Sequence, residues 1–337
     1  MFKKVFILIA AAAFLCSPAS ADDGGSGTNY KIKRLVKELY EKPRRMDAMR
    51  DLASYDGEVV EYVLPVLDDQ TDEFARVAAL KILAETADSS VEEEVIVMLR
   101  DRSQKVRQEA AKTLGAIGTG KSVEPLKRLL TDSFPNVRFN AVRALAKLAP
   151  ESDTDLFIAA LGDYDPRVRM YAVAALGRLR SEEAVPYLTE MVRDYDPGVR
   201  LTVAKALGLI GTQDCLQPLV WLTKDPDTNI RTVAISRLAT LKVNGVDEFL
   251  VESANSLDPR VASRAILALG RRKSPEALEV AKQHLDDEHM SVKLSSIKVV
   301  GEMGDSSDKE ILEPMLKAES SKVRKRAKLA ISEVEKR

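Results

Sequence analysis

The sequence repeats itself with a period of 31 residues, without insertion or deletion, from residue 45 to the C-terminus. Steps of 31 residues give a column that is basic in nearly every repeat: Arg45, Arg76, Arg107, Arg138, Arg169, Arg200, Arg231, Ala262, Lys293 and Arg324. The position eight residues further on is always small: Ala53, Ala84, Gly115, Ala146, Gly177, Gly208, Ala239, Gly270, Gly301 and Ser332. Such a period indicates an array of similar structural units.

Each repeat has the pattern of a helix–turn–helix unit. Val168, Ala172, Ala175, Leu176 and Leu179 are separated by one to four residues in a way that places them on one face of a helix. A second apolar helical segment follows in each repeat, and no segment shows the alternation typical of a β-strand. Because one short helix pair cannot bury both of its faces, the repeats are expected to stack. The predicted fold is therefore an all-α α-solenoid, a right-handed superhelix of about ten helix–turn–helix repeats.

The column of small residues has two possible explanations. Glycine there marks either the end of the first helix or a place where the backbone of a neighbouring helix comes close. The same reasoning applies to Gly115, Gly118 and Gly120, which are interpreted as an inter-helix turn and not as a phosphate-binding loop.

The pattern Asp-x-x-Pro-x-Val-Arg-x-x-Ala-x-x-Ala-Leu-Gly, seen in residues 163–177 and nearly repeated in 194–208, resembles the HEAT repeat. It is most similar to the short HEAT-like repeats of phycobilisome lyases and many bacterial proteins. The resemblance implies that the second helices line the concave face. It also implies a structural ladder in which an Asp and an Arg six residues later recur along the stack. The matching pairs are Asp101 and Arg107, Asp132 and Arg138, Asp163 and Arg169, Asp194 and Arg200, and Asp225 and Arg231.

The ladder is expected to fail near residue 260. One repeat has Ser256 and Ala262 at the two ladder positions, and the next has Asp287 and Lys293. Since the Asp–Arg pair recurs in most repeats, it is interpreted as structural, because a catalytic group is needed only once.

The first residues have the pattern of an export signal. Lys3 and Lys4 precede an apolar run at residues 5–15, and a small-x-small motif ends at Ala21. The expected organisation is a signal peptide at 1–21, a flexible leader at 22–29 and the solenoid at 30–337. The protein is then periplasmic or extracellular and keeps no integral membrane segment after cleavage. Two alternatives stay open, a lipid on Cys16 and an uncleaved anchor.

Composition argues against a metalloenzyme and a disulfide scaffold. The chain has a formal net charge of −1 and only two histidines, so it offers no basic footprint for nucleic acid and few metal ligands. His284 occupies an apolar column and is interpreted as a half-buried core residue, with metal binding as the alternative. Cys215 occupies a column of small apolar residues and is expected to be buried. No catalytic residue, metal or cofactor is predicted.

Aromatic residues in the middle of the array are the candidates for binding a partner. Tyr164 and Tyr195 lie 31 residues apart in successive inter-repeat loops, and Tyr187 and Trp221 are expected on the outward side of second helices. Together with Arg193 they have the residue types of interface anchors. The alternative is that the tyrosines only cover adjacent prolines. The basic segment at residues 322–328 is expected to cap the array or, alternatively, to contact an acidic partner or lipid surface.

These patterns predict a non-enzymatic, exported interaction scaffold that binds a protein or peptide along its concave or edge surface, and no nucleic acid. The alternative is a bilin or tetrapyrrole lyase or chaperone, which the resemblance to phycobilisome lyases suggests. Export argues against that alternative, because those lyases act in the cytoplasm.

Overall fold

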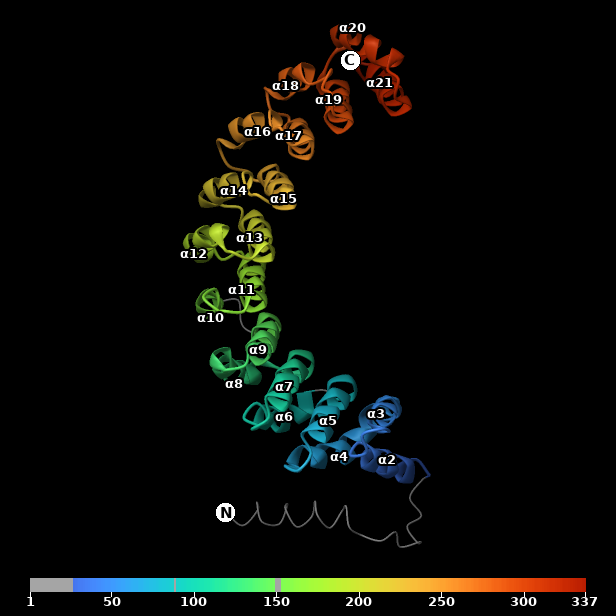
Figure 1. The fold of residues 1–337 in the computed structure, drawn as a ribbon, viewed down its shortest axis with the longest axis vertical. Coiled ribbons are helices and arrows are strands. Elements are labelled where there is room, and N and C mark those ends of the chain that lie inside the picture. The colour runs from blue at the N-terminus through green and yellow to red at the C-terminus, as the bar shows by residue number, and fades with distance from the viewer. Residues whose placement is uncertain (1–26, 88, 149–152) are drawn as a thin grey trace. The chain divides into compact units, whose positions relative to one another are not determined.

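A computed structural model describes residues 27–87, 89–148 and 153–337. The proposed signal peptide, with Cys16 and the cleavage site at Ala21, lies outside these residues. The described chain is helical throughout and contains no β-strand, as the periodicity predicts (Figure 1). It divides into two compact units, of which unit 1 extends to Leu156 and unit 2 comprises Phe157–Arg337. The N-terminal helix of the described chain, α2, begins at Gly27, three residues before the expected start of the solenoid at residue 30.

Unit 1 contains a leading helix followed by alternating first and second helices. Its helices are α2 (Gly27–Glu38), α3 (Arg45–Ala53), α4 (Val60–Val63), α5 (Glu73–Thr86), α6 (Glu92–Met98), α7 (Gln104–Ile117), α8 (Val123–Lys127) and α9 (Pro135–Leu148). Helix α10 (Thr154–Ala160) crosses the boundary between the units. The first helices α3, α5, α7 and α9 pack against one another in chain order.

Unit 2 continues the same alternation. Its helices are α11 (Pro166–Leu179), α12 (Val185–Glu190), α13 (Pro197–Ile210), α14 (Leu216–Leu222), α15 (Thr228–Leu238), α16 (Val246–Ala254), α17 (Pro259–Arg272), α18 (Ala277–Gln283), α19 (Met290–Met303), α20 (Lys309–Leu312) and α21 (Ser321–Val334). The first helices α11, α13, α15, α17, α19 and α21 pack in that order. Short 3₁₀ turns extend several second helices, including one at Met191–Arg193 after α12.

Three first helices of unit 2 begin at an aspartate that caps the helix. Asp165, Asp196 and Asp258 are N-caps whose carboxylates accept a hydrogen bond from a backbone N–H of the first turn. A proline follows each cap at the first helical position, where the missing N–H has no helical partner in any case.

Leucines at one repeat position form part of the core between repeats. Leu176, Leu207 and Leu269 are completely buried on first helices of unit 2. A Cβ atom added to Gly177 would lie 2.6 Å from the Cα atom of Ala206 on the next first helix. Helix α11 continues to Leu179, so this glycine marks the close approach of two helices and not a helix end.

Helix α21 has one apolar and one charged face. The apolar side chains of Val323, Ala327 and Ala330 on α21 are buried. Lys325 and Arg326 on the same helix are exposed.

Candidate partner-binding surface

Each ladder arginine in the middle of unit 2 joins two repeats. Arg169 donates through Nη1 to the carbonyl oxygen of Asp163, at 2.8 Å, and through Nε and Nη2 to the carboxylate of Asp194, at 2.7 and 2.8 Å. Arg200 contacts the carbonyl of Asp194 and the carboxylate of Asp225 in the same way. The Asp six residues before each Arg therefore supplies its carbonyl, and its carboxylate serves the arginine of the preceding repeat.

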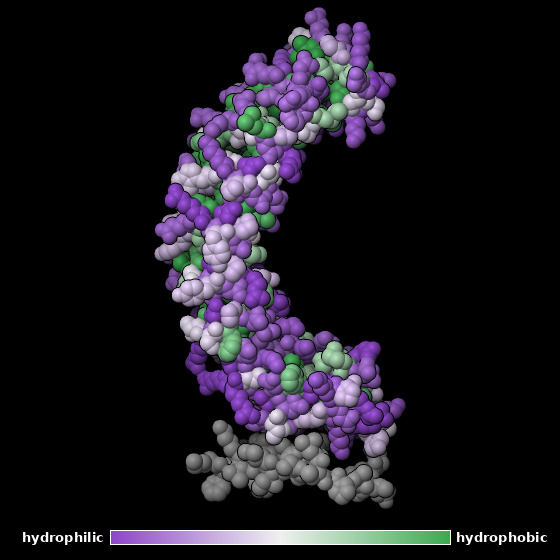
Figure 2. All heavy atoms as spheres, viewed as in Figure 1, coloured by the Kyte–Doolittle hydropathy of each residue, from purple (hydrophilic) through white to green (hydrophobic). Residues whose placement is uncertain are grey.

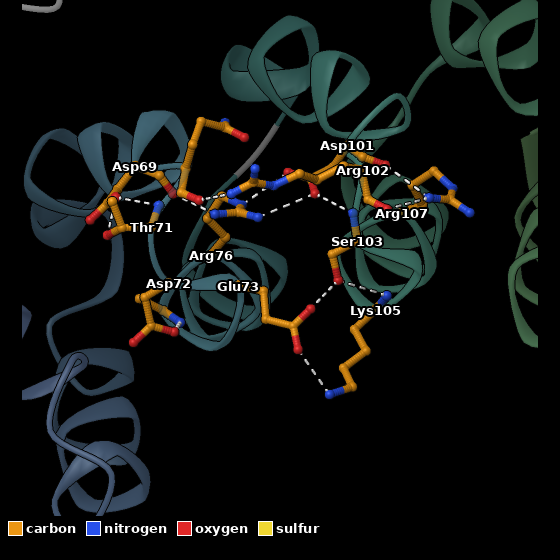
Figure 3. Close-up of polar contacts among 12 residues, drawn as sticks. Asp69, Thr71, Asp72, Glu73, Arg76, Asp101, Arg102, Ser103, Lys105 and Arg107 are labelled. Atoms are coloured by element: carbon orange, nitrogen blue, oxygen red, sulfur yellow. Dashed lines mark hydrogen bonds and ion pairs between the residues drawn. The ribbon is translucent and has the colours of Figure 1, made fainter.

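Unit 1 contains the same arrangement, and Figure 3 shows Arg76 between its own repeat and Asp101 of the next. The two side chains form a buried ion pair with 2.9 Å between Nε and Oδ2. Arg107 pairs with Asp132 at 2.7 Å. Burial raises the pKa of Asp132, but hydrogen bonds from Arg107 and from the Phe134 backbone N–H outweigh burial and lower it.

Two further predicted ladder residues make the expected local contacts. Arg138 donates to the carbonyl oxygen of Asp132 at 2.9 Å. The carboxylate of Asp163 accepts a hydrogen bond from the backbone N–H of Asp165 at 2.7 Å. Both residues thus belong to the turns that start a first helix.

The ladder arginine of the next repeat, Arg231, pairs with a carboxylate at a different position. Arg231 donates to the carbonyl of Asp225 at 2.7 Å, but Ser256 stands where the next ladder Asp would be. Arg231 therefore pairs with Asp258, at 2.5 Å. Burial raises the pKa of Asp258, yet hydrogen bonds from Arg231, the Arg260 backbone N–H and the Thr228 hydroxyl lower it to about 2.

The contacts of the ladder residues lie within the protein. In the repeats of Arg169 and Arg200 the guanidinium and the carboxylate bind one another, and the arginine also binds a backbone carbonyl of its own repeat. Such groups hold neighbouring repeats in register. This supports the structural interpretation of the recurring Asp–Arg pair.

The two predicted loop tyrosines do lie together. The hydroxyl of Tyr195 donates to the carbonyl oxygen of Tyr164 at 3.3 Å, and the guanidinium carbon of Arg169 lies 4.6 Å from the centre of the Tyr195 ring. Tyr195 thus packs on a ladder arginine, a contact that sequence reasoning did not foresee. Tyr164 is 94% exposed and Tyr195 is 73% exposed.

Sequence reasoning missed two members of the same row. Steps of 31 residues from Tyr195 lead to Pro226, which is exposed, and to Leu257, which is 100% exposed. Four successive repeats of unit 2 therefore present an apolar side chain at one register position. We name Tyr164, Tyr195, Pro226 and Leu257 the turn ridge. The sequence does place Pro226 and Leu257 at the same repeat position as the two tyrosines. Attention to aromatic residues alone overlooks them.

A shallow hollow of about 440 Å³ adjoins the turn ridge. Its lining includes the predicted residues Arg193 and Trp221, together with Lys224 and the ridge residue Pro226. Arg193 is exposed and forms no ion pair among the described residues, whereas Lys224 pairs with Glu252 at 3.0 Å. Tyr187 is exposed on α12 but does not line the hollow.

One expectation from the resemblance is wrong for unit 2. The first helices α11, α13, α15, α17 and α19 form an inner row, on the inner side of the unit's curve in Figure 1. The second helices α12, α14, α16 and α18 lie on the outer side. Tyr187 and Trp221 therefore do not line a concave face. Sequence periodicity shows which residues are exposed but not the direction in which a stack bends.

The remaining candidates give no reactive site. His284 is half-buried, with Nδ1 3.5 Å from Oδ2 of Asp287, as its apolar column predicts. Cys215 is completely buried, and its Sγ lies 3.4 Å from the Thr212 hydroxyl. Among the described residues no cluster of His, Cys, Asp and Glu could hold a metal ion. In the same part of the chain, no helix is both long and apolar enough to span a bilayer.

The described architecture is that of an α-solenoid built from helix pairs. The profile of HEAT repeats matches residues 60–146, 123–200, 190–256 and 248–332. The chain belongs to the HEAT repeat family. A search of curated proteins finds no match.

Solved structures confirm the solenoid fold. The chain is similar to a Kap121p mutant, with a TM-score of 0.66 and 13% identity over 97% of this chain and 44% of that one. It is also similar to Kap95p in a structure that concerns its binding to RanGDP, with a TM-score of 0.65 and 12% identity over 98% and 53%. This chain spans about half the length of both. The phycocyanin lyase CpcE–CpcF of Nostoc sp. PCC7120 matches with a TM-score of 0.41 and 22% identity over 72% and 94%.

Proposed function

We propose that this protein is an exported, non-enzymatic scaffold that binds a protein or peptide along the edge of unit 2. The binding surface consists of the turn ridge and the adjoining hollow with Arg193 and Trp221. One observation carries the proposal: four successive repeats expose an apolar side chain at the same position. Random surface residues would not be expected to keep one register across four repeats.

The residue types on this edge fit a protein partner. Tyr, Trp and Arg are the commonest anchors of protein interfaces, and truncation of a central anchor typically costs about 2 kcal/mol or more. Arg193 has no carboxylate partner among the described residues and is therefore available to an external one. The similar karyopherin structures include Kap121p bound to Pho4p, which is a property of that protein and supports the proposal only by fold.

The test uses full-length protein as bait in an envelope extract, with the variant Tyr164→Ala/Tyr195→Ala beside it. The variant is expected to lose the captured partner, with a reduction of roughly 30-fold or more per anchor. Tyr30→Ala is the matched control, because Tyr30 is 70% exposed on α2 of unit 1. Equal capture by the double variant and the wild type would contradict the proposed edge.

Export has its own test. We propose cleavage after Ala21, so the mature chain should begin at Asp22 and appear in the soluble fraction after osmotic release. N-terminal sequencing of the released protein measures this directly. Recovery only in detergent, with a lipid on Cys16, would replace the soluble scaffold by a tethered one.

The lyase or chaperone alternative rests on the resemblance in sequence pattern. A bilin or tetrapyrrole that copurifies with the full-length protein, and is visible in its absorption spectrum, would favour it over the scaffold. Fold similarity alone does not decide between these functions.

A further inference from the structure

Four consecutive first helices of unit 2 carry no acidic residue. The segments α11, α13, α15 and α17 contain neither Asp nor Glu, although each contains at least two Lys or Arg residues. The chain as a whole is close to neutral, with a formal net charge of −1. Charges of opposite sign are therefore separated between different helices of this unit.

Several of these cations are not used inside the protein. Lys205 on α13 and Arg264 and Arg271 on α17 are exposed, and none of them forms an ion pair with a described residue. Arg264 donates a 3.5 Å hydrogen bond to the Ser236 hydroxyl. Arg264 and Arg271 are two turns apart and share one face of α17.

Arg237 on α15 adds an independent observation between these two helices. Its side chain packs against α13, where a Cβ added to Gly208 would meet the Arg237 stem. Its Nε atom is buried and has no hydrogen-bond partner. The Arg237 side chain as a whole is only partly buried, so its positive charge adds to those of the exposed cations on α13 and α17.

One helix of the outer row is acidic. Helix α16 in the outer row carries Asp247, Glu248 and Glu252. Figure 1 places α15 and α17 on the inner side and α16 on the outer side. In Figure 2, hydrophilic residues drawn in purple are prominent along the inner edge of this unit. Asp247 and Glu252 are already paired with Arg272 and Lys224, whereas the exposed cations of the inner row remain able to attract an anionic ligand.

We propose that the inner row of unit 2 binds an acidic protein segment in an extended conformation, with a carboxylate at about every third residue. Lys205, Arg237, Arg264 and Arg271 are its contacts. This surface is separate from the turn ridge, and the proposal does not depend on the ridge.

The spacing of the helices sets the spacing of the carboxylates. Neighbouring packed helices lie about 8–10 Å apart. An extended chain advances about 3.3 Å per residue, so three residues cover about one helix spacing. A segment that crosses α13, α15 and α17 can therefore offer one carboxylate to each helix.

A protein segment fits this surface better than a nucleic acid does. Single-stranded nucleic acids are typically held by aromatic side chains that stack on the bases. The four helices together contain one aromatic residue, Tyr171.

The test is fluorescence anisotropy of the full-length protein with a labelled twelve-residue peptide that has Glu at every third position and Ser and Gly between. Control peptides replace Glu by Gln, or place the same number of Glu residues side by side. The spaced Glu peptide is expected to bind at least about tenfold more tightly than the Gln peptide at low salt. Because exposed charges are screened, binding should weaken at least about tenfold in about 0.5 M NaCl.

Variants assign the binding to the inner row. The triple change Lys205→Glu/Arg264→Glu/Arg271→Glu should reduce affinity for the spaced peptide at least about tenfold, while helical circular dichroism stays unchanged. Arg193→Glu is the matched control, since it makes the same kind of charge change at the edge hollow. Tyr164→Ala/Tyr195→Ala should also bind the peptide normally, which separates this proposal from the edge surface.

Four outcomes would overturn the inference. The first is equal binding of the Glu and Gln peptides, and the second is equal loss of binding in Arg193→Glu and in the triple variant. The third is preferential binding of a single-stranded oligonucleotide of equal charge, which would make the inner row a general polyanion surface. The fourth is equally tight binding of the clustered and the spaced Glu peptides, which would contradict the proposed carboxylate spacing.

Discussion

Two stretches of unit 2 hold their repeats together by different means. From α11 to α15 the residue at the ladder position is an arginine, and Arg169, Arg200 and Arg231 each reach a carboxylate of the following repeat. At the same position α17 has Ala262 and α19 has Lys293, and neither residue forms an ion pair with the part of the chain that the structure describes.

The aspartate that lacks its arginine finds partners within its own repeat. Asp287 lies 25 residues after Ala262, where a ladder arginine would have reached it. Its carboxylate instead accepts the His289 backbone N–H at 2.8 Å and lies 3.5 and 3.3 Å from the Nδ1 atoms of His284 and His289. These are the two histidines of the chain.

The comparison shows what the ladder supplies and what it does not. Helices α17 and α19 still stack, through the buried Leu269, a close contact between Gly270 and Val299, and a 2.8 Å hydrogen bond between Ser263 and Ser295. Apolar packing is therefore sufficient to stack adjacent repeats. The arginines add charged contacts between them. Removal of a ladder residue should have large effects only where a buried carboxylate is left behind.

The largest expected effect is at Arg200. Its partner Asp225 has a side chain that is 3% exposed, so Arg200→Ala leaves a buried carboxylate without its cation. Loss of one partner of a buried pair typically costs about 3–5 kcal/mol. Lys293 occupies the equivalent position and forms no ion pair with a described residue. Lys293→Ala should therefore lower the free energy of unfolding by less than about 1 kcal/mol. Urea unfolding followed by circular dichroism measures both, and equal costs would refute the difference between the two stretches.

Much of this organisation could be read from the sequence, because a 31-residue period fixes which positions recur and helical spacing fixes which face is buried. The buried apolar face of residues 168–179, the half-buried His284 and the buried Cys215 followed from those two rules. The partner of each ladder carboxylate was less obvious. Period alone does not show that the Asp of one repeat serves the Arg of the repeat before it.

The candidate surface was only partly predictable. Tyr164 and Tyr195 were found because aromatic residues are conspicuous, whereas Pro226 and Leu257 have ordinary residue types and only their exposure places them in the turn ridge. The position of Trp221 on the outer row could not be deduced, since residue spacing carries no information on the direction of curvature. The exposed cations of the inner row could not be inferred from the net charge, because acidic residues elsewhere in the chain balance them.

An intermediate effect is expected at low pH. The pKa of Asp258 is lowered from 3.8 to about 2 in the folded protein. A lowered pKa means that the stabilising contribution is complete above about pH 4 and is lost as the pH falls from about 4 to 2. Solvent screening at this partly exposed pair limits the contribution to on the order of 1 kcal/mol. Asp258→Asn should therefore destabilise the protein at about pH 7 but scarcely at about pH 2, as measured by urea unfolding at both values. An equal loss at both pH values would show that the carboxylate charge is not responsible.

The smallest expected effect comes from repair of the interrupted ladder. Ala262→Arg places a guanidinium at the register position that Arg231 holds in the preceding repeat, 25 residues before the carboxylate of Asp287. The new pair must compete with His284 and His289 for that carboxylate, so the gain should stay below about 1 kcal/mol. Asp287→Asn alone and the double variant complete a cycle that isolates the interaction between positions 262 and 287. If Ala262→Arg stabilises the protein equally in the wild-type background and in the Asp287→Asn background, the gain does not come from a restored rung. A coupling energy of a few tenths of a kcal/mol between Arg at 262 and Asp287 would support a restored ion pair. It would show that the repeat register places the Asp287 carboxylate within reach of an arginine at position 262.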